Sequence, residues 1–345
     1  MNTSDLTERE RKVLEAVIES YVVTAEPAGS RTIARRFPLG VSAATIRNTM
    51  SDLEHRGYLY HPHTSAGRIP TDRAYRVYVD SLMGPARLSE SEAEALRREL
   101  RGDHTPIEGI LQKAAQVLGV LTQELGLAAV PSLDHAVLER LELIQVSSER
   151  LLLVLALSGG MARTIFVEVS SALPREAVSS VGLVLNERLR GLPLRDVRAT
   201  LRQRLRNTGA VSGEAELLNI FIEEAEHLFE TPPADDDQVV LGSAQMLAEQ
   251  PEFNSNEQMR TLLELTERRD LLREALRARR EGGLTVTIGG ENLDPRFSAF
   301  TIVTSSYRHG ALSGVIGVMG PTRMPYQKIV SLVEHTSQMV GDLLK

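Results

Sequence analysis

The sequence predicts an α+β protein that begins with a winged helix-turn-helix domain. Within residues 1–83, three helical segments with clear start signals precede a short β-hairpin pattern. Strand patterns at 138–169 return at 284–319, and a long helical region separates them. Strands split by a helical block indicate one α+β domain with a second domain inserted into it.

The helices of the first domain have recognisable N-caps, and the hairpin has a recognisable turn. Ser65-Ala66-Gly67 lies between two short extended segments, as expected for a β-hairpin. A side-chain oxygen at the N-cap accepts a hydrogen bond from a free backbone N–H of the first helical turn. The N-cap candidates are Thr7, which forms a capping-box pattern with Glu10, then Ser30, Ser42 and Thr71.

The remainder of the chain divides by composition and pattern. Residues 84–104 are charged and poor in apolar residues, which indicates a linker that could be helical in part. A helix then starts at Thr105-Pro106, and the predicted boundaries place one α+β domain at 105–189 and 281–345. The helical segment 190–280 is the predicted insertion.

Composition excludes several classes of protein. The 345 residues include no cysteine, so disulfides, thiol catalysis and thiolate metal sites are excluded. No apolar run approaches the ~18 residues of a membrane span. The first twenty residues carry charges where a signal peptide has an apolar core. We therefore expect a cytoplasmic protein with no membrane partner.

Charge is distributed unevenly along the chain. The net charge is −7, yet residues 28–79 contain eight arginines against three acidic residues, a local charge of +5. A basic module on an acidic body is typical of a protein that binds nucleic acid at one end only.

The third helix has the two faces that a DNA recognition helix needs. Ile46, Met50 and Leu53 fall on one narrow arc, and short polar residues fall on the opposite side and its flanks. Asn48 can bridge adenine, Arg47 can bridge guanine or hold a phosphate, and Ala44 can approach a thymine methyl. The alternative is an ordinary solvated helix face. The predicted DNA contacts on this helix are Ser42, Ala44, Thr45, Arg47, Asn48 and Ser51.

The hairpin favours the DNA-binding interpretation. A hairpin after three helices makes a winged helix, whose wing lies along phosphates or in a minor groove. A metal pair at the His-x-His pattern is the weaker alternative, because no carboxylate or further histidine is close in sequence. The predicted wing contacts are His61, His63, Thr64, Ser65 and Arg68.

Signatures of catalysis are missing from the sequence. It has no Walker phosphate loop, zinc-protease helix or Gly-x-Ser-x-Gly elbow. Asp235–Asp237 is interpreted as an exposed acidic loop, and Gly289-Gly290-Glu291-Asn292 as a turn after a strand. For Pro321, Arg323 and Tyr326 a packing role is favoured. We expect neither an enzyme nor a bound cofactor or metal.

Five sequence motifs follow one another along almost the whole chain. They are SAATIRNTMSDLE (42–54), PHTSAGRIPTD (62–72), QPEF (250–253), IGGEN (288–292) and GVIGVMGPTRMPY (314–326). With these motifs in this order, the chain resembles the HrcA heat-shock repressor family. That family usually has an acidic residue where Thr49 stands and a second glycine where Ser243 stands, and neither position is a predicted DNA contact.

The resemblance implies a winged helix at 1–83, a GAF-like domain at 105–189 and 281–345, and a dimerising insertion at 190–280. It implies a homodimer on double-stranded DNA at an inverted-repeat operator called CIRCE, upstream of chaperone operons. The GroE chaperonin would modulate the repressor. The alternative function is a ligand-sensing winged-helix regulator with a metabolite in the GAF-like domain.

An inverted repeat requires two winged helices about a two-fold axis. The predicted insertion offers apolar residues that could form this interface, although packing on the GAF-like domain is the alternative. These residues are Leu217, Leu218, Phe221, Ile222, Leu262, Leu263 and Leu272.

Overall fold

The computed structural model describes residues 6–62, 67–84, 88–100, 107–131, 133–158, 161–169, 173–205, 212–223, 239–279, 282–309 and 312–344. The chain is an α+β protein, as predicted, and it forms two compact units. The first unit comprises 1–128, 239–306 and 315–340, and the second comprises 129–238, 307–314 and 341–345. Each unit is described separately below.

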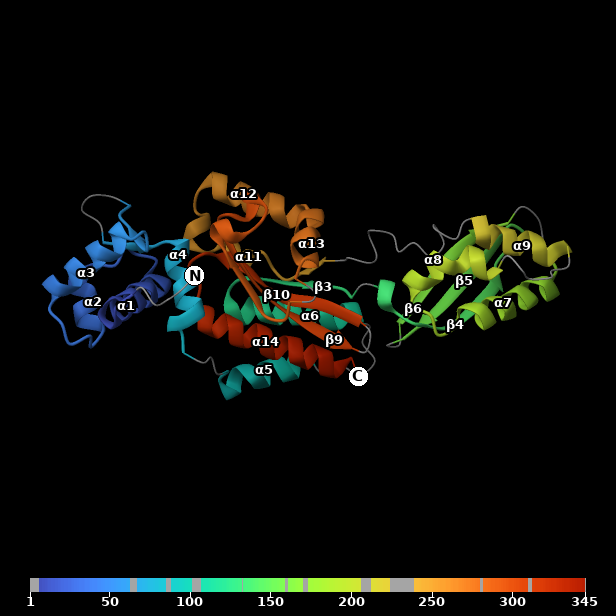
Figure 1. The fold of residues 1–345 in the computed structure, drawn as a ribbon, viewed down its shortest axis with the longest axis horizontal. Helices are drawn as coiled ribbons and strands as arrows, with labels where there is room; N and C mark the ends of the chain where they lie inside the picture. The colour runs from blue at the N-terminus through green and yellow to red at the C-terminus, as the bar shows by residue number, and fades with distance from the viewer. Residues whose placement is uncertain are drawn as a thin grey trace. The chain divides into compact units, whose positions relative to one another are not determined.

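The first unit begins with helices and a small antiparallel sheet (Figure 1). The predicted capping box is present at Thr7, whose N–H donates to Glu10 Oε2 over 2.7 Å. Val17, Ile33 and Leu53, from three different helices, are fully buried and form the centre of this part. Its elements are α1 (Glu8–Thr24), α2 (Ser30–Arg36), α3 (Ala43–His55), β1 (Leu59–Tyr60), β2 (Ile69–Pro70) and α4 (Asp72–Val77), which continues as a π turn (Tyr78–Leu82).

The rest of the first unit is built on a five-stranded sheet in the order β7-β3-β10-β9-β8. Its strands are β3 (Leu125–Ala129), β7 (Val239–Leu241), β8 (Thr285–Ile288), β9 (Phe300–His309) and β10 (Leu312–Pro321). Helices α6 (Ile107–Thr122) and α14 (Tyr326–Leu343) run alongside it (Figure 1). Shorter elements complete this part: α11 (Gln245–Ala248), η4 (Pro251–Phe253), α12 (Asn256–Glu267), α13 (Arg269–Arg277), η5 (Gly289–Glu291) and η6 (Pro295–Phe297).

Part of the predicted linker is a packed helix. Residues Glu90–Leu100 form α5, whose Leu96 and Leu100 are buried. Ser89 opens this helix, because its hydroxyl accepts from the Glu92 N–H over 3.3 Å. The three buried positions of α5 recur at helical spacing, so the helical part of this segment is a short amphipathic helix.

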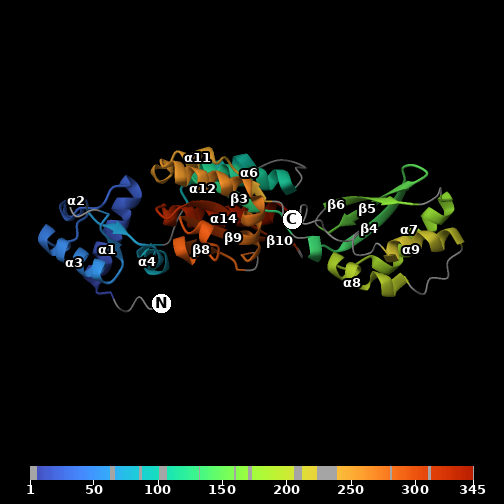
Figure 2. The ribbon, with the colours of Figure 1, turned by 90° about the horizontal axis from the view of Figure 1, so that it is seen from above.

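The second unit is a three-stranded antiparallel sheet covered by helices on one face (Figure 2). Alternate residues of the central strand, including Leu151, Leu153 and Leu155, point into one core with Leu185 and Phe221. Its elements are β4 (Leu138–Gln145), β5 (Arg150–Leu157), β6 (Met161–Glu168), α7 (Arg175–Leu189), α8 (Leu194–Leu205) and α9 (Ser212–Glu223).

The boundaries of the second unit differ from those predicted for the insertion. Strands at 138–168 belong with α7, α8 and α9, whereas 239–279 belongs to the first unit. Most of the apolar residues predicted for a dimer interface are interior: Leu217, Leu218 and Phe221 lie in the core of the second unit. Leu262 and Leu272 are buried in the first unit, and only Leu263 is well exposed, at 51%.

In the described part of the chain, no helix combines the length and apolar character that a membrane crossing requires.

Candidate nucleic-acid interface

Helix α3 is fixed in place by its cap and its apolar face. Ser42 is the N-cap, and its hydroxyl accepts from the Thr45 N–H over 3.1 Å. Ile46, Met50 and Leu53 are buried, as the sequence predicted. The unusual Thr49 lies on this inner side, 3% exposed, and donates from Oγ1 to the Thr45 carbonyl over 3.1 Å. The opposite side of α3 is therefore the one that faces solvent.

The predicted recognition residues occupy that outer side. Ser42, Ala44, Arg47 and Asn48 are exposed, and Thr45 and Ser51 are half-buried. The Arg47 and Asn48 side chains make no hydrogen bond to any residue that the structure describes. Both can therefore reach a ligand without breaking a contact inside the protein.

Half of the arginines in the basic segment serve internal contacts. Arg56 pairs with Glu10 over 2.9 Å, and Arg73 donates to the Arg56 carbonyl and lies 4.5 Å over the Tyr58 ring. Arg68 and Arg76 pair with carboxylates as described below. The exposed arginines that form no ion pair or hydrogen bond with a described residue are Arg31, Arg35, Arg36 and Arg47, on α2 and α3. The predicted site includes no residue of α2, although the three arginines of this helix are visible in the sequence as a cluster of positive charge.

The hairpin residues that the structure describes turn toward α3. Glu54 accepts from His61 Nδ1 over 2.5 Å and from Arg68 Nη2 over 2.8 Å. The Arg68 side chain is only 15% exposed, and its ion pair with Glu54 connects the hairpin to α3. Sequence reasoning missed Glu54, because the partner of a carboxylate is not encoded locally. His63, Thr64 and Ser65 lie outside the described residues, as does Asp235–Asp237.

We expect Arg68→Ala to lower the free energy of unfolding by about 1 kcal/mol, because a half-buried ion pair with Glu54 is lost. Thermal melts would measure this change, with exposed Arg35→Ala as the control that leaves stability unaltered. The salt dependence of DNA affinity should stay that of the wild type. If the variant instead had unchanged stability and a weaker salt dependence of DNA affinity, Arg68 would be a phosphate contact.

A junction joins these helices to the sheet of the same unit at α4. Asp72 accepts from the Gly290 N–H over 3.0 Å, and Arg76 pairs with Glu291 over 2.5 Å. Gly289 has φ +54°, and a Cβ there would lie 2.1 Å from Asp72 Oδ2, so this position requires glycine. The Gly-Gly-Glu-Asn sequence is thus a turn that holds α4.

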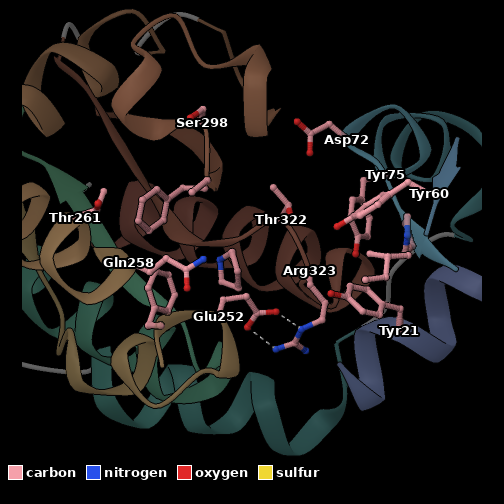
Figure 3. Close-up of a pocket in the computed structure, with 16 residues that line it drawn as sticks. Tyr21, Tyr60, Asp72, Tyr75, Glu252, Gln258, Thr261, Ser298, Thr322 and Arg323 are labelled. Atoms are coloured by element: carbon pink, nitrogen blue, oxygen red, sulfur yellow. Dashed lines mark hydrogen bonds and ion pairs between the residues drawn. The ribbon is translucent and has the colours of Figure 1, made fainter. Parts of the chain in front are cut away.

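Arg323 makes the second set of junction contacts (Figure 3). It donates to Glu252 Oε1 over 2.5 Å, to Gln250 Oε1 over 2.9 Å and to the Val22 carbonyl of α1 over 2.7 Å. Beside the Arg323–Glu252 ion pair is a cavity of about 310 Å³ lined by Tyr21, Asp72 and Tyr75, among others. Residues from four of the five sequence motifs therefore meet at the junction.

Glu124 is a buried carboxyl group near Arg323. Its side chain is 1% exposed, and Oε2 has no hydrogen-bond partner among the described residues. Burial raises the pKa of Glu124 well above its usual value, and the charge of Arg323 offsets only part of this effect. The folded chain holds this proton more tightly than the unfolded chain, so stability declines as pH rises above the unfolded pKa.

We expect Glu124→Gln to raise Tm at about pH 8, because glutamine has no proton to lose, and to raise it far less at about pH 4.5. The measurement is a pair of thermal melts for wild type and variant. Glu187→Gln, at an exposed carboxylate on α7, is the control with no such trend. An equal rise in Tm at both pH values would contradict this account, because it would show that the effect does not depend on the ionisation of Glu124.

Comparison with known proteins finds relatives along the full length of the chain. Residues 108–330 match the family "HrcA protein C terminal domain". The chain is 38% identical to the heat-inducible transcription repressor HrcA of Chlorobium phaeobacteroides (strain BS1), over 99% of both chains. It is also 38% identical to the repressor of the same name from Chlorobaculum tepidum, over 100% of this chain and 99% of that one.

A solved structure described as a hypothetical protein shares the fold, with a TM-score of 0.62 at 23% identity over 99% of both chains. The relatives that match over the full chain define a transcription regulator. More specifically, the chain belongs to the HrcA family of heat-inducible transcription repressors.

Proposed function

We propose that this chain is a winged-helix repressor of heat-inducible chaperone operons. It binds an inverted-repeat, CIRCE-type operator as a homodimer, and the GroE chaperonin modulates it. The observation that carries the proposal is the outer side of α3, where Arg47 and Asn48 are exposed beside a capped helix N-terminus. A recognition helix presents short polar groups of this kind to base edges in the major groove.

The proposed DNA-binding domain is residues 1–83, with α3 as the recognition helix and the β1–β2 hairpin as the wing. The exposed arginines of α2 supply phosphate contacts, which position a protein on the duplex without reading sequence. In this proposal Ser42, Ala44, Thr45 and Ser51 complete the contact surface of α3. His61 and Arg68 hold the wing against Glu54, and the residues at the wing tip reach the DNA.

The five-stranded sheet with α6 and α14 is the proposed GAF-like domain, and the second unit is the proposed dimerising insertion. The uncovered face of its β4–β6 sheet has an apolar cross-strand row, Ile144–Leu152–Phe166, given by the strand register. Ile144 is 46% exposed and Phe166 is 56% exposed. Water-exposed rows of this kind are stabilised when a second copy covers them, so we assign the dimer contact to this face.

A gel-shift experiment with the full chain tests the proposal. A duplex carrying an inverted repeat should be retarded at lower protein concentration than a duplex with the same bases scrambled. Addition of GroE chaperonin should lower the protein concentration that is needed. Equal retardation of both duplexes would exclude an operator-specific repressor, and an unchanged shift with chaperonin would exclude that mode of modulation.

A further inference from the structure

A cleft of about 740 Å³ lies between α13 and the segment from β8 to η6. We call it the α13 cleft. Its wall is largely apolar, and its volume is in the range typical of small-molecule sites. The residues that line it include Leu271, Ala275, Ala278, Arg279, Leu293 and Phe297.

Arg279 places a positive charge in the wall of the α13 cleft and forms no ion pair with a carboxylate that the structure describes. Its Nη2 donates to Thr287 Oγ1 over 2.6 Å and to Asn292 Oδ1 over 3.3 Å, and its Nη1 donates to the Ala275 carbonyl. All of these acceptors are neutral. Nε is buried and has no partner among the described residues. Burial lowers the pKa of Arg279, and no carboxylate among the described residues opposes that effect.

The acidic residues that line the α13 cleft do not neutralise Arg279. Glu291 is paired with Arg76, and Asp294 is paired with Arg296 over 2.5 Å. Glu274 is exposed and forms no ion pair with a described residue. A half-buried guanidinium without a carboxylate is unusual, because a buried charge is normally paired. A ligand's anionic group can supply such a counter-charge.

We propose that the α13 cleft binds a small carboxylate with an apolar body. The carboxylate compensates the charge of Arg279, since guanidinium and carboxylate form strong charge-assisted hydrogen bonds. The apolar body lies against Leu271, Leu293 and Phe297. The Leu293 side chain is 97% exposed, and it loses contact with water when the ligand binds. This small-molecule site goes beyond the repressor function proposed above.

The site is connected to the junction at α4 by one residue. Asn292 accepts from Arg279 and from Thr287 Oγ1, the latter over 2.7 Å. Its Nδ2 donates to the carbonyls of Gly289, Phe297 and Phe300, which fixes the η5 turn. That turn bonds Asp72 and Arg76 of α4. A ligand that draws Arg279 away from Asn292 therefore acts on the turn that holds the DNA-binding part.

Calorimetric titration of the full chain with octanoate tests the proposal, with octanamide as the neutral probe of the same shape. We expect saturable 1:1 binding of octanoate and at least about tenfold weaker binding of octanamide, since the anion loses its partner charge. Arg279→Gln should weaken octanoate binding by at least about tenfold. Arg277→Gln, which removes an exposed cation of the same helix that does not line the cleft, should leave it unchanged.

A second variant covers the case in which Arg279→Gln does not fold. Ala278 is exposed and lines the α13 cleft, so Ala278→Phe should fill the cleft and abolish octanoate binding while Arg279 stays intact. Circular dichroism melts would establish that each variant is folded. The proposal is overturned if octanoate does not bind, if octanamide binds equally well, or if folded Arg279→Gln and Ala278→Phe both bind octanoate as the wild type does.

Discussion

Arg47→Ala and Asn48→Ala are each expected to weaken operator binding by about 1–3 kcal/mol, which is roughly 5- to 150-fold in Kd. Both side chains are exposed on α3 and point away from buried Ile46 and Leu53, so the Tm of each variant should stay close to that of the wild type. Each variant should also discriminate less at one base pair of the half-site. Fluorescence anisotropy at one fixed salt concentration, on the operator and on single-base variants, measures both effects.

Arg202→Ala is the matched control for Arg47→Ala. It removes the same exposed charge from α8 in the second unit, and it should leave operator affinity unchanged. Unaltered affinity in both α3 variants would mean that the outer side of α3 is an ordinary solvated surface. An equal loss of affinity for the operator and for scrambled DNA would show that Arg47 contacts phosphate and does not read a base.

Phe221→Glu is expected to abolish cooperative folding of the second unit. Phe221 is fully buried in the core of that unit, and a carboxylate there loses its hydration without gaining a partner. Changes of this kind cost more than about 4 kcal/mol, a large share of the stability of a domain. Urea unfolding and limited proteolysis would show early loss of residues 129–238.

Phe166→Glu is the matched substitution on the opposite face of the same sheet. Phe166 is 56% exposed, so the variant should stay folded and yet sediment as a monomer, because the apolar row is interrupted. A folded Phe166→Glu variant that remains dimeric would place the interface elsewhere. A cooperatively folded Phe221→Glu variant would contradict the packing of α9 on the sheet.

Local signals in the sequence predicted local structure well. The Thr7–Glu10 capping box, the Ser42 cap and the inner face of α3 depend on residues within one helix, and the structure has each of them. The strands at 285–288 and 300–309 were likewise visible as short apolar runs between turn residues. These features follow from hydrogen bonding and periodicity over a few residues.

Partners that are distant in sequence could not be predicted. The strands at 138–168 were assigned to the main sheet, because alternation shows that a strand is half-buried and does not show what covers it. The same limit applies to Arg68 with Glu54, and to Arg76 with Glu291, which are 215 residues apart. Surplus positive charge in residues 28–79 indicated DNA binding, but it did not show which arginines were already paired.

A thermodynamic cycle between the protein and single DNA atoms tests base readout by α3 most directly. Guanines of the operator half-site are replaced one at a time by 7-deazaguanine, which lacks the N7 acceptor that arginine binds, and each duplex is titrated with wild type and Arg47→Ala. Adenines are replaced by 7-deazaadenine for Asn48→Ala. We predict that at one position per half-site the two losses are not additive, with a coupling of about 1–3 kcal/mol. Additive losses at every position for both residues would show that α3 does not read the bases.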